Sequence, residues 1–186
     1  KPSRPGDGQR DITFSRELYV EADDFLPEPV PKYKRLYPGG PECRLKGAYL
    51  IRCVGYETDE NGNVTEIAAE YDPDSRGGNP ADGRKVKGAT IHWVDAATAV
   101  DAECRLYDNL FSDPAPDAAD KDFLACLHPD SLEGVTGCKV EDGLADALAP
   151  ANCQRLRLGA FRLASRDSRH GPRGLNGSGC PKRGLK

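Results

Sequence analysis

Residues 44–71 read RLKGAYLIRCVGYETDENGNVTEIAAEY, and this stretch carries the clearest evidence of the fold. Its two halves are rich in Leu, Ile, Val and Tyr, and the polar segment DENGN at residues 59–63 separates them. Asn and Gly tolerate the positive φ angles that hairpin turns require. In the second half Ile67 and Tyr71 fall on one face of an extended chain, and Glu66 falls on the other. The stretch therefore predicts a β-hairpin.

The rest of the chain also favours short strands. Alternating or β-branched segments occur at residues 16–20, 87–93, 102–106 and 154–163. Prolines at positions 27, 29, 31 and 38 exclude a helix interior or a central strand from most of residues 25–41. Frequent turns, and the lack of a long segment with helical periodicity, predict an all-β protein built from barrels or sandwiches.

The composition is that of a soluble globular protein, with 38% hydrophobic and 30% charged residues among 186. No apolar run approaches the roughly 18 residues of a membrane span. The seven cysteines are scattered without a C-x-x-C pair, which favours free thiols in a cytosolic protein over disulfides or a zinc site. His92 and Trp93 are expected to pack structurally. The absence of Met favours a piece of a longer protein, and we predict no catalytic or metal-ligating residue in it.

Charge is distributed unevenly along the chain. The net charge is −4, yet from Gln154 to the C-terminus nine Lys or Arg residues accompany one acidic residue, Asp167. Phosphates respond to local basic surface, and an acidic remainder helps to orient the protein. The overall negative charge therefore does not exclude a nucleic acid partner. For the last dozen residues a solvated basic tail is an equal alternative.

Three short basic clusters lie in the part of the chain before Gln154, which is acidic overall. They are Lys32, Lys34 and Arg35 in the proline-rich loop, Arg44 and Lys46 at the start of the hairpin, and Arg84, Lys85 and Lys87 before the next strand. Arg presents a planar fork that suits base edges, whereas Lys is a mobile point charge that suits phosphates. In an extended segment Lys34 projects opposite to Tyr33 and Arg35, so that one side can meet bases and the other the backbone. Each cluster alone is more simply interpreted as a solvent-exposed charged surface. The three clusters together favour contacts with RNA.

Seven sequence blocks, taken in order, resemble the C-terminal anticodon-binding region of bacterial-type glutaminyl-tRNA synthetases, which are class I aminoacyl-tRNA synthetases. The blocks are SRELY at residues 15–19, DF at 24–25, YKRL at 33–36, RLKGAY at 44–49, DGRKVKG at 82–88, IHWV at 91–94 and RLYD at 105–108. The resemblance extends from about residue 10 to about residue 168. Seven blocks in the same order are far more specific than any one of them.

The resemblance implies two ribosomal protein L25-like β-barrels that follow a Rossmann catalytic domain. Residues 1–24 would form a lead-in segment and part of the proximal barrel, and residues 25–80 the distal, anticodon-binding barrel. Residues 81–168 would supply return strands and the proximal barrel, which is incomplete because its first strands precede this chain. Residues 169–186 would be a divergent basic tail.

The resemblance also assigns roles to individual side chains. Arg35 would contact the third anticodon base and Arg44 the first, with Lys46 as a neighbouring cation. Gln154 and Arg157 would contact the middle base, although residues 154–161 read QRLRLGAF where the family has a Q-F-E-R-x-G-Y-F pattern. The predicted RNA-binding residues are therefore Lys32, Lys34, Arg35, Arg44, Lys46, Gln154 and Arg157.

The implied activity is the ligation of glutamine to its tRNA, with ATP and Mg bound in the catalytic domain. This part of the protein would supply recognition, hold no cofactor and be inactive alone. Its expected partners are the anticodon loop and stem of glutamine tRNA and the catalytic domain of the same polypeptide, in a cytoplasmic monomer without membrane contact. The alternatives are a stand-alone L25-like protein that binds ribosomal RNA, and a β-domain whose basic clusters are merely solvated.

Overall fold

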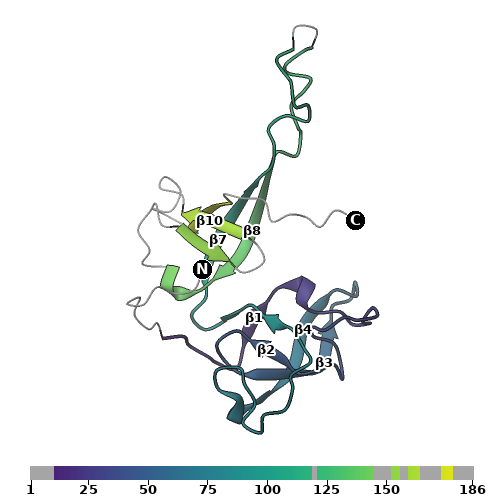
Figure 1. Ribbon diagram of the computed structural model, residues 1–186, viewed down its shortest axis with the longest axis vertical. Coiled ribbons are helices and arrows are strands. Elements are labelled where there is room, and N and C mark those ends of the chain that lie inside the picture. The colour runs from purple at the N-terminus through teal and green to yellow at the C-terminus, as the bar shows by residue number, and fades with distance from the viewer. Residues whose placement is uncertain (1–10, 119–120, 145–151, 156–158, 164–172, 178–186) are drawn as a thin grey trace. The chain divides into compact units, whose positions relative to one another are not determined.

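The computed structural model describes residues 11–118, 121–144, 152–155, 159–163 and 173–177, with backbone alone at 152–155, 159–160, 163 and 173. These ranges contain strands and three single-turn 3-10 segments of three residues each. The predicted all-β class is confirmed, while closure of the sheets into barrels stays a prediction. Contacts divide the chain into two units, Lys1–Ala97 and Thr98–Lys186, both visible in Figure 1. Within the described ranges, no helix has the length and apolar character needed to cross a membrane.

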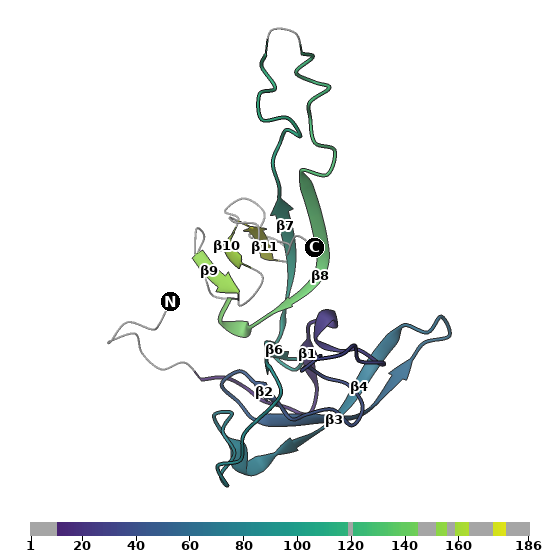
Figure 2. The same ribbon diagram turned by 45° about the vertical axis from the view of Figure 1, so that its right-hand side comes forward.

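The first unit contains two sheets. Its elements are β1 (Leu18–Val20), η1 (Ala22–Asp24), β2 (Cys43–Leu45), β3 (Leu50–Thr58), β4 (Val64–Asp72), η2 (Pro73–Ser75), β5 (Thr90–Ile91) and β6 (Trp93–Asp95). One sheet has the order β4-β3-β2-β5, and the other pairs β1 with β6. The β2–β5 pair is parallel, and the remaining pairs in this unit are antiparallel. Figure 2 labels β2, β3 and β4 of the larger sheet and β1 and β6 of the smaller one.

The predicted hairpin is confirmed. β3 and β4 pair antiparallel from Leu50↔Asp72 to Thr58↔Val64. In the turn, the carboxylate of Asp59 accepts the backbone N–H groups of Asn61 and Asn63 at 2.9 and 2.7 Å, which fixes the reversal that the Asn and Gly residues indicated.

One expected strand is in fact two. The sequence suggested a continuous strand from Arg44 to Tyr56, but the chain reverses between β2 and β3. Gly47 has a φ of 75°, and the Ala48 N–H bonds to the Leu45 carbonyl at 3.0 Å. A side chain at that φ would be strained, so Gly47 permits the tight turn that separates β2 from β3.

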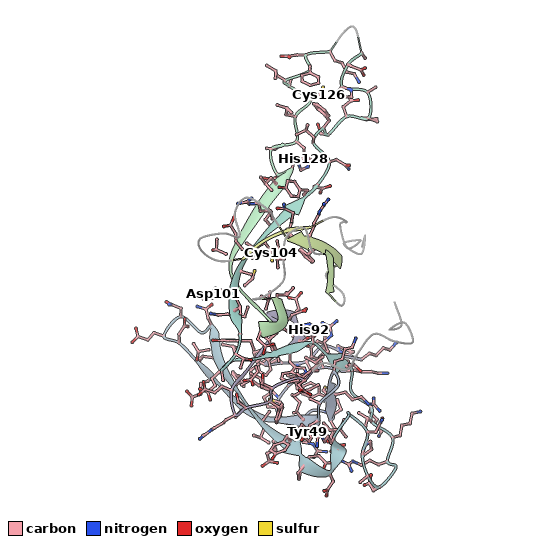
Figure 3. The ribbon with its side chains drawn as sticks, turned by 90° about the vertical axis from the view of Figure 1, so that its left-hand side faces the viewer. Tyr49, His92, Asp101, Cys104, Cys126 and His128 are labelled. Atoms are coloured by element: carbon pink, nitrogen blue, oxygen red, sulfur yellow. The ribbon has the colours of Figure 1, made fainter. Side chains whose placement is uncertain are left out.

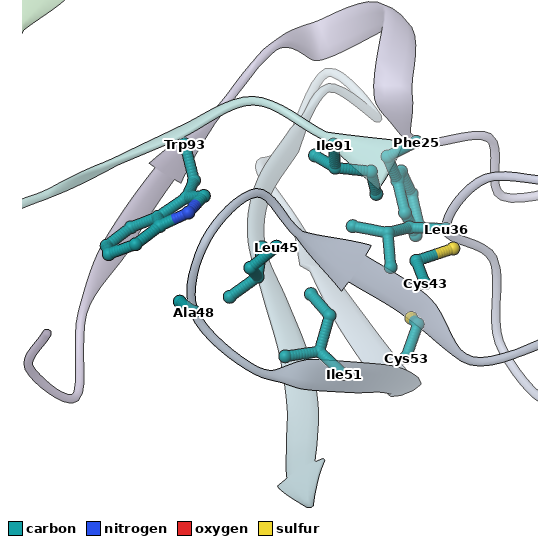
Figure 4. Packing of buried hydrophobic residues seen from close by; sticks show 9 residues of the cluster. All are labelled: Phe25, Leu36, Cys43, Leu45, Ala48, Ile51, Cys53, Ile91 and Trp93. Carbon is teal, nitrogen blue, oxygen red and sulfur yellow. The ribbon is translucent and has the colours of Figure 1, made fainter. Parts of the chain in front are cut away.

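A single extended segment joins the two sheets of this unit. β5 and β6 are separated by His92 alone, yet β5 belongs to the larger sheet and β6 pairs with β1. The side chains of Ile91 and Trp93 both pack in the same core, so this segment connects the two sheets through one hydrophobic cluster (Figure 4). Trp93 is therefore a core residue, as predicted. The buried cluster comprises Phe25, Leu36, Cys43, Leu45, Ala48, Ile51, Cys53, Ile91 and Trp93.

The second unit has one five-stranded sheet. Its elements are β7 (Val100–Tyr107), β8 (Leu132–Val140), η3 (Asp142–Leu144), β9 (Asn152–Arg155), β10 (Gly159–Leu163) and β11 (Arg173–Gly177), in the order β8-β7-β11-β10-β9. β11 runs parallel to β7, and the other pairs are antiparallel. Its own core contains Ala102, Cys104, Val140, Phe161 and Leu175. Each unit thus has a separate hydrophobic core.

The connection between β7 and β8 extends beyond the sheet of its own unit. Cys126 and His128 lie in this extension, whereas Cys104 lies in the sheet (Figure 3). The rings of Phe111 and Phe123 pack there with centroids 4.9 Å apart, and an isolated bridge joins Phe111 to Leu127.

The cysteines whose side chains are described are free, as predicted: Cys43, Cys53, Cys104, Cys126 and Cys138. Burial raises the pKa of the Cys43 thiol to about 11, so this group stays neutral and packs as a small apolar side chain.

The boundary between the two units lies after Ala97 in the sequence. β5 and β6 belong to the first unit because they pair with β2 and β1. Residues 81–97 therefore make their strand contacts within the first unit. The assignment of residues 25–80 and 81–168 to distal and proximal barrels stays a prediction.

Candidate nucleic-acid interface

Two of the predicted basic segments are joined through the backbone of Ala89. The Ala89 N–H donates to the Lys34 carbonyl at 2.7 Å, and the Ala89 carbonyl accepts the Arg44 N–H at 3.0 Å. One step further along, the Lys46 N–H donates to the Ile91 carbonyl at 3.0 Å. The backbones of Lys34, Arg44 and Lys46 therefore belong to one hydrogen-bonded layer, although they come from separate parts of the sequence.

Gly88 allows this layer to form. Its N–H donates to the Glu42 carbonyl at 3.1 Å, and a Cβ added at Gly88 would lie 2.2 Å from that carbonyl oxygen and 2.8 Å from Cys43 Sγ. No side chain fits there without separating β5 from β2. The sequence did not indicate this role, because a lone glycine beside basic residues is typical of an ordinary turn.

Arg35 is held by the chain before it. Its Nε lies 3.3 Å from Asp24 Oδ1, and its NH1 donates to the Asp23 carbonyl at 3.0 Å. The Tyr33 hydroxyl donates to the same carbonyl at 3.1 Å, and partial burial raises the pKa of this phenol. Tyr33 and Arg35 thus share one side of the segment, as the alternation predicted, and Lys34 is exposed.

Arg44 is held in a similar way, but by a neutral group. Its Nε donates to the Gly78 carbonyl at 2.7 Å, and its Cδ would lie 3.6 Å from a Cβ on Gly78. The residues that follow η2 therefore support the middle of this side chain. Within the part of the chain that the structure describes, its two terminal nitrogens have no hydrogen-bond or ion-pair partner, and these are the atoms that form a fork for a base edge.

Lys46 lies just beyond β2 rather than within it. Its side chain is exposed, and its carbonyl accepts the Trp93 indole N–H at 3.1 Å. The turn that carries this cation is therefore anchored directly to the core.

Lys32 occupies an unusual backbone conformation. Its φ is 69°, and it is the one non-glycine residue with positive φ in the described ranges. The Tyr33 N–H bonds to the Val30 carbonyl at 3.0 Å, so Pro31 and Lys32 form the centre of a turn. Pro at the first central position and positive φ at the second define a type II turn, where Gly is the usual second residue. The lysine is exposed at the turn.

Arg84 has carboxylates on several sides. It bonds to Glu42 through Nε and NH2 at 3.0 and 2.9 Å, to Asp72 through NH2 at 2.6 Å, and to Asp82 through NH1 at 2.9 Å. These bonds raise the pKa of the guanidinium, and the bond from Arg84 lowers the pKa of Glu42. Arg84 therefore connects parts of the fold, and its charge is compensated locally.

The other two candidates lie in the second unit. Gln154 is in β9 opposite Ala160, and its side chain lies outside the described residues. Arg157 lies outside the described residues entirely. Their predicted contact with the middle anticodon base stays a prediction.

Two family models and several curated relatives match this chain. Residues 1–72 and residues 90–164 match two family models, each described as the anticodon-binding domain of class I tRNA synthetases (E and Q). Among curated relatives, the chain is 51% identical over 173 residues to the Glutamine–tRNA ligase of Bordetella avium, covering 90% of this chain and 28% of the relative. It is 55% identical over 158 residues to that of Pseudoalteromonas atlantica, covering 84% and 28%.

A third relative, the Glutamine–tRNA ligase of Bradyrhizobium diazoefficiens, is 46% identical over 170 residues, which is 91% of this chain and 30% of the relative. The chain thus spans less than a third of the length of these curated relatives. The two matched models together cover most of the residues of the chain. Both models have the same description. The chain belongs to the family of anticodon-binding domains of the class I tRNA synthetases for glutamate and glutamine.

Proposed function

We propose that this chain recognises the anticodon arm of glutamine tRNA as part of a glutamine–tRNA ligase. The observation that carries the proposal is the shared state of Arg35 and Arg44. Each guanidinium is held within the fold: that of Arg35 by an ion pair to Asp24, with Nε at 3.3 Å, and by the NH1 hydrogen bond to the Asp23 carbonyl, and that of Arg44 by the hydrogen bond from Nε to the Gly78 carbonyl at 2.7 Å. A guanidinium held in this way has a fixed plane, and a fixed plane is what bidentate recognition of a base edge needs.

The lysines complete the proposed interface in a different role. Lys32, Lys34 and Lys46 are exposed and flank the two arginines in the sequence. Ammonium groups suit the phosphate backbone, which positions the RNA, whereas the arginine forks read the unstacked bases of the loop. By resemblance to the family, Arg44 reads the first anticodon base, Arg35 the third, and Gln154 with Arg157 the middle one.

The chemistry of ligation belongs to the rest of the proposed enzyme. ATP and Mg would bind in the catalytic domain, and this chain would contribute no reacting group. Binding energy from correct anticodon bases would be used to align the distant acceptor end, which is how recognition contributes to rate. We expect the intact ligase to be a cytoplasmic monomer.

The proposal is tested by binding of this chain to glutamine tRNA and to single-base anticodon variants across a salt series. Arg44→Lys is expected to reduce discrimination at the first anticodon base by about 1–3 kcal/mol, because the ammonium cannot form the fork. Arg52→Lys is the matched control, since Arg52 is exposed on the neighbouring strand β3. Equal weakening for every anticodon would mean that Arg44 contacts phosphate and would contradict the proposed role.

The same titration separates the alternatives. A ribosomal RNA hairpin that binds more tightly than glutamine tRNA, with no anticodon preference, would favour a ribosomal RNA-binding protein. Absence of RNA affinity even at low salt would mean that the basic clusters are merely solvated.

A further inference from the structure

Asp24 is a buried carboxylate beside a proposed base-reading residue. It ends η1 and its side chain is 0% exposed, whereas the side chain of Arg35 is 35% exposed. A carboxylate removed from water needs a compensating charge or several hydrogen bonds. The Arg35 guanidinium supplies such a charge, with Nε at 3.3 Å from Asp24 Oδ1. The pair therefore joins the fold's interior to the candidate RNA surface.

The backbones on both sides of this pair are fixed by the core. The Leu36 N–H donates to the Asp24 carbonyl at 3.0 Å, and the Leu26 N–H donates to the Leu36 carbonyl at 3.1 Å. Phe25 and Leu36, which follow Asp24 and Arg35 in the sequence, form a parallel bridge and are both buried in the cluster of Figure 4. The distance between the two Cα positions is thus set by packing, and the ion pair decides only where the guanidinium points.

Asp23 reinforces this arrangement through its backbone. Its carbonyl accepts from Arg35 NH1 at 3.0 Å and from the Tyr33 hydroxyl at 3.1 Å. The ion pair to Asp24 and one hydrogen of NH1 are then used within the fold, whereas NH2 has no partner among the described residues. The edge of the guanidinium that faces away from Asp24 is the edge left for a ligand.

We propose that Asp24 is a positioning residue for anticodon recognition: its buried carboxylate fixes the plane of Arg35 so that the outer edge of the guanidinium meets the third anticodon base. The inference rests on the proposed function. A long arginine side chain is mobile when free, and a reading group must be held close to its productive geometry by residues that are themselves rigid. Asp24 is rigid because it is buried and its backbone is bonded to Leu36.

The test compares four proteins in the same tRNA titration: the unchanged full chain, Asp24→Asn, Arg35→Lys and the double variant. Asn preserves the size of Asp24 but removes the charge that holds Nε. Asp24→Asn is expected to reduce discrimination at the third anticodon position about tenfold, and to leave the salt dependence unchanged because the phosphate contacts remain. Asp23→Asn is the matched control, since it changes an exposed neighbouring carboxylate and keeps the backbone carbonyl.

The double variant separates positioning from general destabilisation. If Asp24 acts through Arg35, then Asp24→Asn in the Arg35→Lys background causes no further loss of discrimination at the third position. An additional loss of the same size in that background would overturn the proposal. Full discrimination by a folded Asp24→Asn protein, alongside its loss in Arg35→Lys, would also overturn it while leaving the proposed function intact. Full discrimination by Arg35→Lys would instead contradict the proposed role of Arg35 and the positioning role with it.

A measurement on the unchanged protein covers the case in which Asp24→Asn fails to fold. Nitrogen-15 NMR of arginine side chains is expected to show slow rotation for the guanidinium of Arg35, which is held by the Asp24 ion pair and by the NH1 bond to the Asp23 carbonyl, and fast rotation for that of Arg52, which is exposed. Binding of the anticodon stem-loop is expected to shift the terminal nitrogens of Arg35 more than its Nε. An Arg35 guanidinium that rotates as fast as that of Arg52 would overturn the proposal.

Discussion

At the scale of single residues, neighbouring cations in the first unit have different tasks. Arg84 is surrounded by three carboxylates. Arg35 is held by an ion pair to Asp24 and by an NH1 hydrogen bond, and Arg44 by an Nε hydrogen bond. The lysines are exposed at turns and segment ends. Sequence clusters of Lys and Arg look alike in all three cases, so only the partners of each side chain separate structural cations from candidate ligand contacts.

The two arginines should differ in their effect on stability. Arg35→Ala removes a cation that lies 3.3 Å from the buried Asp24 carboxylate and is expected to destabilise the first unit by about 2 kcal/mol, less than for a fully buried pair because Arg35 is partly exposed. Arg44→Ala removes a donor from a neutral carbonyl and should destabilise it by about 1 kcal/mol. Urea unfolding followed by tryptophan fluorescence measures both. Equal losses would show that the Asp24–Arg35 pair does not contribute as the geometry indicates.

Lys32 offers a second test at this scale. Its φ of 69° strains a lysine by about 1–2 kcal/mol, whereas glycine adopts that angle freely but loses about 0.5–1 kcal/mol through the entropy of the unfolded chain. Lys32→Gly is therefore expected to raise the free energy of unfolding slightly while weakening RNA binding at low salt. Lys34→Gly, at a position whose φ is not positive, serves as the control and should not stabilise the protein. A clear loss of stability in Lys32→Gly would contradict the turn geometry.

At the scale of elements, residues 82–91 form the connection that organises the candidate interface. Ala89 bonds to both Lys34 and Arg44, Gly88 fits against Glu42 and Cys43, and Arg84 reaches Glu42 and Asp72. This stretch, which contains the DGRKVKG block, therefore positions the proposed base-reading residues of other segments. It does this mainly through its backbone and through one internally compensated arginine.

Gly88→Ala tests the close approach of β5 to β2. The added Cβ would lie 2.2 Å from the Glu42 carbonyl oxygen, and a backbone atom cannot move aside without breaking the pairing. We expect a loss of about 2–3 kcal/mol in the free energy of unfolding. Gly55→Ala is the control, because a Cβ there meets nothing within 4 Å. If the two substitutions lowered the free energy of unfolding by the same small amount, Gly88 would have to lie farther from the Glu42 carbonyl than the structure places it.

Arg84 makes the connection sensitive to acid. The bond from Arg84 holds the pKa of Glu42 below its ordinary value of 4.5, so this carboxylate contributes stability above that value and loses it as the pH falls through the lowered pKa. Arg84→Gln should therefore be less stable than the unchanged protein near neutral pH, and the difference should narrow below about pH 4.5. Urea unfolding at several pH values measures this, with Arg76→Gln, an exposed arginine, as the control. A difference that stays constant with pH would exclude Glu42 as the titrating group.

At the scale of the whole molecule, the two units have separate cores. The cluster of the first unit draws its buried residues from the range between Phe25 and Trp93, and that of the second from the range between Ala102 and Leu175. Among the residues that the structure describes, neither cluster takes a buried residue from the other unit. Each unit therefore has the means to fold independently.

Residues 1–97 expressed alone are expected to unfold cooperatively. Trp93 is the single Trp of the chain and is 5% exposed, so its fluorescence reports on the first unit. The shortened protein should keep the blue-shifted emission of the full chain, with a similar urea midpoint. Emission typical of solvent-exposed Trp would show that the first core depends on the second unit.

The sequence by itself was sufficient for the all-β class, the β3–β4 hairpin and the burial of Trp93. These features arise from local rules: period-two alternation, and Asn and Gly at positions that need unusual φ angles. It also placed Tyr33 and Arg35 on one side of their segment, because that requires only the alternation of an extended chain. Seven ordered motif blocks identified the family, since short motifs persist where their chemistry is required.

Only the tertiary structure decided which cations serve the fold and which remain for a ligand. Asp24 and Arg35 are eleven positions apart in the sequence, and Arg44 and Gly78 are 34 apart. Many other pairs of residues have the same separations and make no contact, so the separation does not predict the contact. Whether such groups meet depends on the packing of Phe25 on Leu36 and of β5 against β2. Periodicity describes one element at a time, whereas the direction of a guanidinium is set by acceptors that other elements bring to it.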